Sequence, residues 1–291
     1  MGKKDKKDKK DKKGKKGQKK PKKPKGPPMA ESADKYVLYQ KSVQAPEADL
    51  EFFDSTFQAE FKRKPKLLRE DFCGTFAASV AWAKLRPDNR VWGVDLDPEP
   101  LAWGREHNLT QLSPEQAERL TLIQGDVRDP RDFKVDVIAA QNFSFCIFKV
   151  RDELRAYFKT CLEGLNDEGI MVLDIFGGPE SIQPAEDETE HEEDGFSYIW
   201  DQKRYDAITN EIQCAIHFHF KDGSKLTDAF TYDWRLWTIA ELRELLVEAG
   251  FKKADAYWEG TDDDDEGNGE FVKSASEENE DAWIAYVVGV K

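Results

Sequence analysis

Apolar residues in the middle of the chain form short runs that alternate with helical patterns. Five runs are short and apolar enough to predict strands: Leu67 to Asp71, Arg90 to Asp95, Leu120 to Gln124, Val135 to Ala140 and Ile170 to Ile175. The segments between them place apolar residues at helical spacing, most clearly from Phe76 to Leu85 and from Leu154 to Leu165. Strands that alternate with helices predict a parallel sheet with helices on both faces.

The pattern changes after the fifth run. An acidic stretch from Pro179 to Gly195 predicts a loop, and three alternating runs between residues 196 and 236 predict an antiparallel insert. A helix with a capping box at Thr238 follows. Phe251 to Trp258 and Trp283 to Val290 then predict two more strands. The expected fold is α/β, a seven-stranded, mostly parallel sheet with helices on both faces and an antiparallel cap.

These changes of pattern divide the chain into five parts. Before the first strand, apolar residues at helical spacing from Leu50 to Phe61 predict a helix that either covers a pocket or packs on the sheet. The parts are a disordered lysine-rich tail (1–29), an N-terminal lid segment (30–66), the cofactor-binding core (67–178), the acidic loop and insert (179–237) and the C-terminal part of the core sheet (238–291).

Polar residues stand at the carboxyl ends of the first four predicted strands. Glu70 precedes Gly74 after the first strand, Asp95 ends the second, Asp126 follows the third and Asn142 follows the fourth. Ends of parallel strands meet at one edge of a sheet, where ligands bind. Asp95 comes 21 positions after Gly74, close to the spacing at which an acid takes ribose hydroxyls. Each residue alone is also typical of a turn or cap, but together they predict an adenosine-binding site.

The segments that carry these residues resemble a known family. EDFCGTF, VWGVDLDPEPL, GDVRD and VDVIAAQNFSF are similar to the first four motifs of the class I S-adenosylmethionine-dependent methyltransferases. The resemblance covers Leu67 to the C-terminus. It implies a Rossmann-like core, S-adenosylmethionine as the cofactor, and a seventh strand that inserts antiparallel between the fifth and the sixth.

The resemblance also implies roles for single residues. Glu70 would orient the turn and the methionine amino end of the cofactor. Gly74 would let the backbone approach the cofactor closely, and Asp95 would accept the ribose hydroxyls. Leu96 would lie beside the adenine, and Asp126 would receive the adenine amino hydrogens, with Val127 behind it. Asn142 and the Gln141 carbonyl would face the sulfonium. The cofactor-binding candidates are Arg69, Glu70, Gly74, Asp95, Leu96, Asp126, Val127 and Asn142.

Arg69 is a candidate for the cofactor's carboxylate, and an ion pair with Glu70 or Asp71 is the alternative. Phe72 and Phe76 depart from the family, because they occupy positions that are usually glycine. Their side chains would narrow the turn or cover the methionine end. They would also obstruct a pyrophosphate, which favours a cofactor without phosphates over a nicotinamide dinucleotide.

The methyl acceptor is harder to read, and the sequence singles out no catalytic residue. The fourth motif lacks an Asn-Pro-Pro-Tyr tetrapeptide, which disfavours planar amide or base nitrogens of nucleic acid. Tyr39, Tyr232 and Arg235 are substrate-binding candidates because they lie on the predicted lid and insert; packing is the alternative for each. His217 and His219 could present two metal ligands, but no matching Cys or His lies nearby, so no metal is predicted.

Charge is distributed unevenly along the chain. Residues 1–25 carry 15 Lys and three Asp, so a net +12, whereas the whole chain carries −14 and the remainder therefore −26. An acidic body repels nucleic acid, which leaves the lysine-rich tail as the only segment expected to bind it. No apolar run is long enough to span a membrane. The four cysteines are scattered, which is typical of reduced thiols and predicts a cytoplasmic protein.

The sequence thus predicts a methyltransferase that acts on a small-molecule acceptor. Two alternatives remain: a protein or ribosome methyltransferase guided by the basic tail, and a cofactor-binding protein of the same fold without turnover.

Overall fold

The computed structural model describes residues 26–261 and 267–291. Within them, an eight-stranded sheet has the order β11-β10-β12-β5-β4-β1-β2-β3, and a separate four-stranded sheet has the order β6-β7-β8-β9. The strands of the large sheet are β1 (Leu67–Asp71), β2 (Arg90–Asp95), β3 (Leu120–Gln124), β4 (Val135–Ala140), β5 (Leu165–Gly177), β10 (Lys253–Thr261), β11 (Gly267–Ser274) and β12 (Trp283–Val290). Strands β1 to β5 are parallel, and β12 runs antiparallel between β5 and β10.

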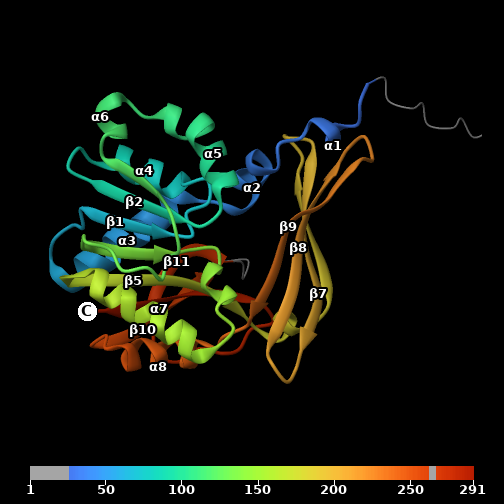
Figure 1. The fold of residues 1–291 in the computed structure, drawn as a ribbon. Helices are drawn as coiled ribbons and strands as arrows, with labels where there is room; N and C mark the ends of the chain where they lie inside the picture. The colour runs from blue at the N-terminus through green and yellow to red at the C-terminus, as the bar shows by residue number, and fades with distance from the viewer. Residues whose placement is uncertain (1–25, 262–266) are drawn as a thin grey trace, which may run out of the picture.

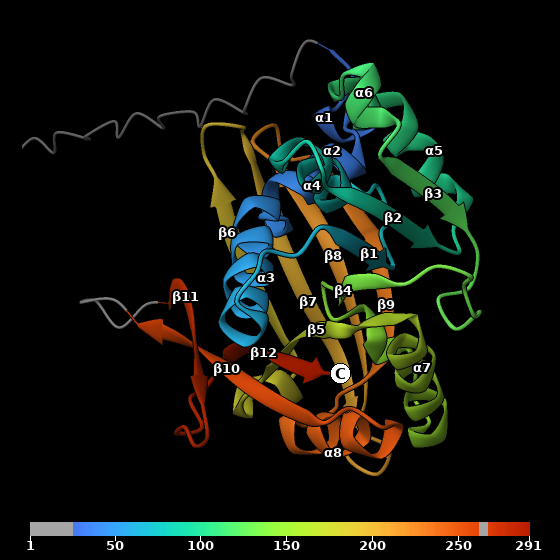
Figure 2. The same cartoon turned by 90° about the vertical axis from the view of Figure 1, so that its left-hand side faces the viewer.

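Helices cover both faces of this sheet (Figures 1 and 2). On one face, α3 (Pro46–Phe61), α4 (Ala77–Leu85) and α5 (Pro98–His107) contribute to one buried cluster. On the other face, α7 (Arg151–Gly164) and α8 (Ile239–Ala249) contribute to a second. The remaining short elements are α1 (Met29–Ser32), α2 (Lys35–Val43), α6 (Pro114–Ala117), η1 (Leu109–Gln111), η2 (Ser144–Ile147) and η3 (Pro179–Ile182).

The small sheet is the predicted insert. It contains β6 (Ala185–His191), β7 (Phe196–Asp206), β8 (Glu211–Phe220) and β9 (Lys225–Arg235), and it stands beside the core where β5 runs into it (Figure 1). The acidic stretch was expected to be a loop, but its residues 185–191 form β6, an exposed edge strand. Charged side chains on an edge prevent further strands from pairing with it, which explains an acidic sequence in a strand.

The sequence also missed one strand of the large sheet. Seven strands were expected, and β11 adds an eighth at the edge by pairing antiparallel with β10. The acidic tip between them, residues 262–266, lies outside the described residues, as do residues 1–25 of the predicted disordered tail. None of the helices in the described part of the chain is long and apolar enough to cross a membrane.

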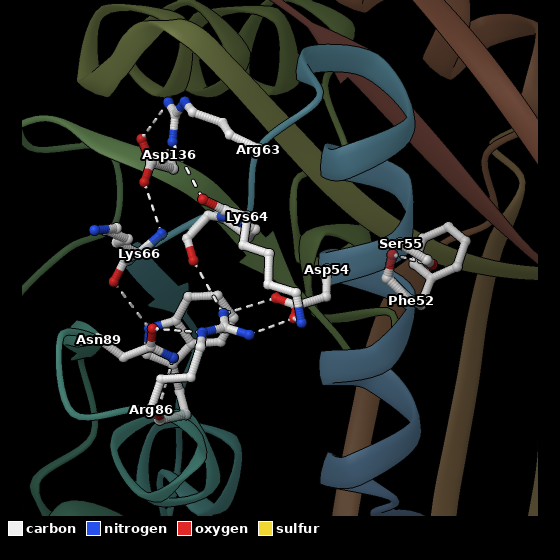
Figure 3. A network of polar contacts seen from close by, with 11 residues as sticks. Phe52, Asp54, Ser55, Arg63, Lys64, Lys66, Arg86, Asn89 and Asp136 are labelled. Carbon is white, nitrogen blue, oxygen red and sulfur yellow. Dashed lines mark hydrogen bonds and ion pairs between the residues drawn. The ribbon is translucent and has the colours of Figure 1, made fainter.

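A polar network holds α3 to the end of the sheet at which the parallel strands begin, opposite to the predicted site (Figure 3). Asp54 of α3 accepts hydrogen bonds from both terminal nitrogens of Arg86, and Arg86 also donates to the carbonyl of Pro65 over 3.0 Å. Arg63 reaches Asp136 over 3.1 Å. Since Phe53 and Phe57 of the same helix are buried in the core, α3 packs on the sheet as a fixed element.

The preceding helices, α1 and α2, lie between core and insert (Figure 1). Gln40 of α2 donates to the Thr75 hydroxyl over 2.8 Å, and the Tyr36 hydroxyl donates to Glu99 over 2.9 Å. On the other side, the ring of Tyr39 packs 4.9 Å from that of Phe230 in β9. Helix α2 of the predicted lid segment therefore contacts both the turn after β1 and the insert.

Candidate cofactor site

The turn after β1 has an unusual backbone. Phe72, Gly74 and Phe76 all adopt left-handed conformations, with φ of 57°, 50° and 54°. The turn is fixed to β2 by the Cys73 amide, which donates to the Val94 carbonyl over 3.0 Å. Left-handed conformations cost bulky residues free energy, and such strain is often found at functional sites.

The two phenylalanines that replace glycine keep the backbone conformation that glycine favours. The ring of Phe76 is fully buried in the core cluster under α4 and α5. The ring of Phe72 packs toward Phe148 and Tyr157, with centroids 6.0 and 5.9 Å away. Both rings thus pack against other side chains of the protein. This packing explains their positions without a role in narrowing the turn or covering the methionine end of the cofactor.

Glu70 ties the end of β1 to the start of α4. Its carboxylate accepts hydrogen bonds from the Ser79 amide, over 2.8 Å, and from the Ser79 hydroxyl. Burial raises the pKa of Glu70 to about 7, although the Ser79 hydrogen bonds oppose the shift. The acid of the first motif therefore orients the turn by holding the first turn of α4.

Asp95 and Gly74, 21 positions apart in the sequence, are in direct contact. The Gly74 amide donates to Oδ2 of Asp95 over 2.7 Å, and the Asp97 amide donates to Oδ1 over 2.8 Å. Burial raises the pKa of Asp95. Leu96, next in the chain, leaves 67% of its surface exposed. An acid fixed at a strand tip beside an exposed apolar side chain is suited to a ribose and its base.

The third strand tip is organised differently. Arg128 forms a two-pronged ion pair with Asp126, with its closest contact at 2.7 Å, and these hydrogen bonds lower the pKa of Asp126. Val127 is only 5% exposed and belongs to the core cluster on the α7 side. An adenine amino group would therefore share Asp126 with Arg128.

The turn after β4 reveals an acid that the sequence analysis missed. Asn142 and Phe143 are both left-handed, with φ of 57° and 56°. Their amides donate to the two oxygens of Asp174 in β5, over 2.7 and 2.9 Å. Asp174 is 9% exposed, and burial raises its pKa to about 7. A carboxyl inside the otherwise apolar run IMVLDI was the sequence signal for it.

Asp49 of α3 is a second missed acid. It accepts a hydrogen bond from the Tyr286 hydroxyl of β12 over 2.8 Å, and burial raises its pKa to about 6. Its charge raises the pKa of both Glu70 and Asp174, so the three carboxyls face one region. Their hydrogen bonds come from amides and hydroxyls, and no ion pair within residues 26–261 and 267–291 includes any of them.

A further polar group in this region lacks a partner. Both side-chain amide atoms of Gln141, directly after β4, are buried without a hydrogen bond to the described residues. Buried polar atoms are nearly always satisfied in folded proteins. The strand tips therefore offer negative charge and unpaired polar atoms to a ligand.

For Arg69 the structure shows the alternative, an ion pair with Asp71, in place of a contact with the cofactor. Arg69 is 1% exposed and forms a two-pronged ion pair with Asp71, through hydrogen bonds of 2.8 and 2.7 Å. The Tyr157 hydroxyl donates to the same carboxylate over 2.8 Å. Alternation along β1 directs Arg69 and Asp71 toward α7, whereas Glu70 points toward α4. Arg69 is a structural residue.

The three predicted acceptor residues lie in two places. Tyr39 and Tyr232 approach each other between α2 and β9; burial raises the pKa of Tyr39 to about 12, with the Tyr232 hydroxyl opposing the shift. Arg235 is directed elsewhere: it stacks 3.8 Å above the ring of Trp237 and binds Glu241 and the Lys149 carbonyl, each over 3.1 Å. Arg235 thus anchors β9 to α8 and to the segment before α7, and the structure does not place it with the tyrosines.

His217 and His219 lie on the outer face of the insert. The two ring nitrogens of His217 contact Asp201, over 3.1 Å, and the Asp228 amide, over 2.7 Å. In the part of the chain that the structure describes, no group of three or more His, Cys, Asp or Glu is arranged to hold a metal ion.

Known proteins share this architecture. No family model matches the chain. A Bacillus subtilis protein named "Putative methyltransferase YqeM" is 25% identical over 187 residues, which cover 62% of this chain and 71% of the relative. A solved S-adenosylmethionine-dependent methyltransferase from Clostridium acetobutylicum superimposes with a TM-score of 0.63 at 18% identity, over 88% of this chain and 97% of that one. CalS10 of Micromonospora echinaspora, described as an amino pentose methyltransferase, gives 0.61 at 17% identity, over 88% and 96%.

Proposed function

We propose that this protein, which has the fold of the class I S-adenosylmethionine-dependent methyltransferases, transfers the methyl group of S-adenosylmethionine to a small-molecule acceptor. The resemblance predicted from the sequence is confirmed, as is the mostly parallel sheet with an antiparallel cap. The acceptor and the site residues are our proposal.

One observation carries the choice of cofactor: Glu70, Asp174 and Asp49 are gathered at the strand tips, and none of them pairs with a cation in the part of the chain that the structure describes. Burying carboxylates without a cation costs free energy, and their raised pKa values reflect this. S-adenosylmethionine carries a sulfonium and an ammonium and would compensate the charge. A dinucleotide pyrophosphate would add negative charge to the same region.

The sheet order suggests how the cofactor lies. Asp95 and Leu96 on β2 would bind the ribose and adenine, with Asp126 at the adenine amino group. Glu70 on the neighbouring strand β1, together with Asp49 of α3, would face the methionine ammonium. Gln141 and Asn142, after β4, would line the path of the methyl group.

The cofactor supplies an electrophilic methyl group when it is bound. The chain's own contribution is to hold the acceptor in line with that methyl, since proximity and orientation lower the barrier of such a displacement. Helix α2 and the insert, which meet over the strand tips at Tyr39 and Phe230, would limit water there. The product would be S-adenosylhomocysteine.

A small molecule is the favoured acceptor for two reasons. Helix α2 packs against β9 through Tyr39 and Phe230, and this cover over the strand tips favours a compact ligand. One of the solved proteins of this fold is described as acting on an amino pentose. All four cysteines are free and buried, and we place the protein in the cytoplasm on that ground.

Calorimetric titration with S-adenosylmethionine tests the proposal. The wild type is expected to bind, and Asp95→Ala to bind at least tenfold more weakly, because the ribose hydroxyls lose a charged acceptor. Asp88→Ala is the matched control: Asp88 lies at the opposite end of β2 in an exposed ion pair with Lys66, so its binding should equal that of the wild type. A wild type that does not bind S-adenosylmethionine contradicts the proposal.

Deleting residues 1–25 separates this proposal from tail-guided methylation of proteins or ribosomes. Activity on small acceptors should be retained without the tail. Cofactor binding with no methylation across a broad acceptor panel would instead support a binding protein without turnover.

A further inference from the structure

Five aromatic side chains lie where the strand tips meet the insert. We call Phe143, Phe176, Trp200, Tyr232 and Trp234 the aromatic wall. Phe143 and Phe176, from the core, have ring centroids 4.7 Å apart. They meet the insert at Trp234, 6.4 Å from Phe143, and at Trp200, 6.4 Å from Phe176. The rings of Tyr232 and Trp234 lie 4.3 Å apart.

The wall is not an ordinary piece of core. Trp234 is 4% exposed, but Phe143, Phe176, Trp200 and Tyr232 are only partly buried. Large rings that stay partly accessible where two sheets of a protein meet are typical of a ligand surface. They also come from both the strand tips and the insert, so a ligand against them would lie next to the proposed methyl donor.

A carboxylate lies at the base of this wall. Asp174 accepts a hydrogen bond from the Phe143 amide over 2.9 Å. It precedes Phe176 by two positions in β5, so the two side chains share one face of the strand. The titratable groups that face it are Asp49 from α3, Tyr39 from α2, Tyr286 from β12 and Cys146 from η2. None of these is a cation, so Asp174 has no positive partner among them.

Aromatic rings beside a carboxylate favour one chemical class of acceptor over others. Faces of Trp and Tyr rings attract ammonium groups, and a buried carboxylate adds a charge partner. A carboxylate acceptor would be repelled by Asp174. A hydroxyl acceptor would bring no charge of its own to pair with Asp174 and would gain nothing from the ring faces.

We propose that the acceptor is an amine, that it binds as an ammonium against the aromatic wall, and that Asp174 takes its proton. This inference rests on the proposed function. The neutral nitrogen then forms a bond to the methyl carbon through its lone pair. The bond between that carbon and sulfur breaks with its electrons remaining on sulfur, so the products are a methylated ammonium and a neutral thioether.

Matched acceptor pairs test the chemistry. Glucosamine and glucose, ethanolamine and ethylene glycol, and phenethylamine and 2-phenylethanol would each be incubated with the protein and methyl-labelled S-adenosylmethionine. Label is expected in at least one amine and in none of the hydroxyl partners. If S-adenosylmethionine binds but label enters hydroxyl compounds as readily, the inference is overturned and the proposed function stands. If S-adenosylmethionine does not bind, the proposed function fails first.

Binding to the wall can be measured without turnover. Choline carries a quaternary ammonium, and 3,3-dimethylbutan-1-ol is its neutral isostere. In the presence of S-adenosylhomocysteine, choline is expected to bind more tightly than the alcohol. Trp200→Leu should remove about tenfold of that preference, and Trp200→Phe should retain most of it. Trp92→Leu is the control and should change nothing, because Trp92 lies in β2 with its ring stacked on Phe133. Equal binding of the two compounds to the wild type overturns the inference.

The pH profile tests the proton acceptor. With the amine found above, kcat/KM of the wild type should rise as pH increases through about 7, where Asp174 loses its proton. Asp174→Asn should lower kcat about 100-fold and abolish that rise. Because Asp174 also binds the backbone of the turn after β4, the kinetics of Asp174→Asn are interpretable only if the variant still binds S-adenosylhomocysteine. If it does not, the KM of Trp200→Leu for the amine is the test, and an unchanged KM overturns the inference.

Discussion

The ring of Phe76 occupies the space that a side chain at position 104 would need. A Cβ built on Gly104 of α5 would lie 2.4 Å from Cε1 of Phe76 and 2.6 Å from the Thr75 carbonyl oxygen. The first motif has phenylalanine where the class I S-adenosylmethionine-dependent methyltransferases usually have glycine, and the neighbouring helix has glycine where the phenylalanine ring packs. The departure in the turn is thus compensated within the protein, and it leaves the backbone of the cofactor loop in the left-handed form.

Restoring glycine at position 76 is therefore expected to harm the protein. Phe76→Gly should lower the free energy of unfolding by about 3 kcal/mol, because losing a fully buried ring outweighs the relief of a left-handed backbone. Phe76→Ala should be about 1 kcal/mol less stable still, since alanine keeps the strain and glycine does not. Urea denaturation measures both. An alanine variant more stable than the glycine variant would contradict the left-handed assignment.

The contact between Asp54 and Arg86 should matter for stability and not for the cofactor. The side chains are only 16% and 19% exposed, so Asp54→Ala leaves a charged donor without its partner. We expect a loss of about 2 kcal/mol in urea denaturation. S-adenosylmethionine affinity at 15 °C should stay within twofold of the wild type. A large loss of affinity would show that α3 transmits changes to the strand tips.

Cofactor affinity should depend on pH. Burial raises the pKa values of Glu70 and Asp174 to about 7 and of Asp49 to about 6, so these carboxyls hold protons below neutrality. A cationic ligand favours their ionised forms. The affinity for S-adenosylmethionine should rise between pH 5.5 and 7.5, with protons released on binding. Calorimetry in two buffers of different ionisation enthalpy counts those protons; an affinity that falls with pH would contradict the assignment.

The same groups set the pH dependence of stability without ligand. Their folded pKa values exceed the ordinary values near 4, so the native state binds more protons than the unfolded state between about pH 4 and 7. Their contribution to stability is therefore lost as pH rises through that window. Glu70→Gln should reduce the slope of unfolding free energy against pH, which denaturant titrations at several pH values would measure.

Helix α2 should loosen when its links to α5 are removed. Trp103 donates to Asp34 over 2.7 Å, and Asp34 also caps α2 through the Tyr36 amide over 2.9 Å. Trp103→Phe should speed amide hydrogen exchange across residues 35–43, and S-adenosylmethionine should slow it again if α2 covers the site. Trp258→Phe is the control. Unchanged exchange in Trp103→Phe would show that contacts with the insert suffice to hold α2.

The regular part of this structure was predictable because its physics is local. Hydrophobic periodicity places β1 to β5, and the parallel arrangement brings their ends together, so the contact between Gly74 and Asp95 follows from spacing alone. The cofactor-binding role considered for Arg69 did not hold, because alternate residues of β1 face opposite helices and Arg69 faces α7. Asp49 and Asp174 were missed because their importance arises from burial by segments far away in the chain, which no local pattern records.

The central position of β12 has a consequence for biosynthesis. This strand fills the gap between β5 and β10, more than 100 residues after β5. Until residue 290 has emerged from the ribosome, β5 has an open edge and the sheet cannot close. Open edges recruit other chains, and contacts between distant segments form slowly. Closure of the sheet thus depends on a late insertion step, and nascent chains halted before β12 should be found bound to chaperones.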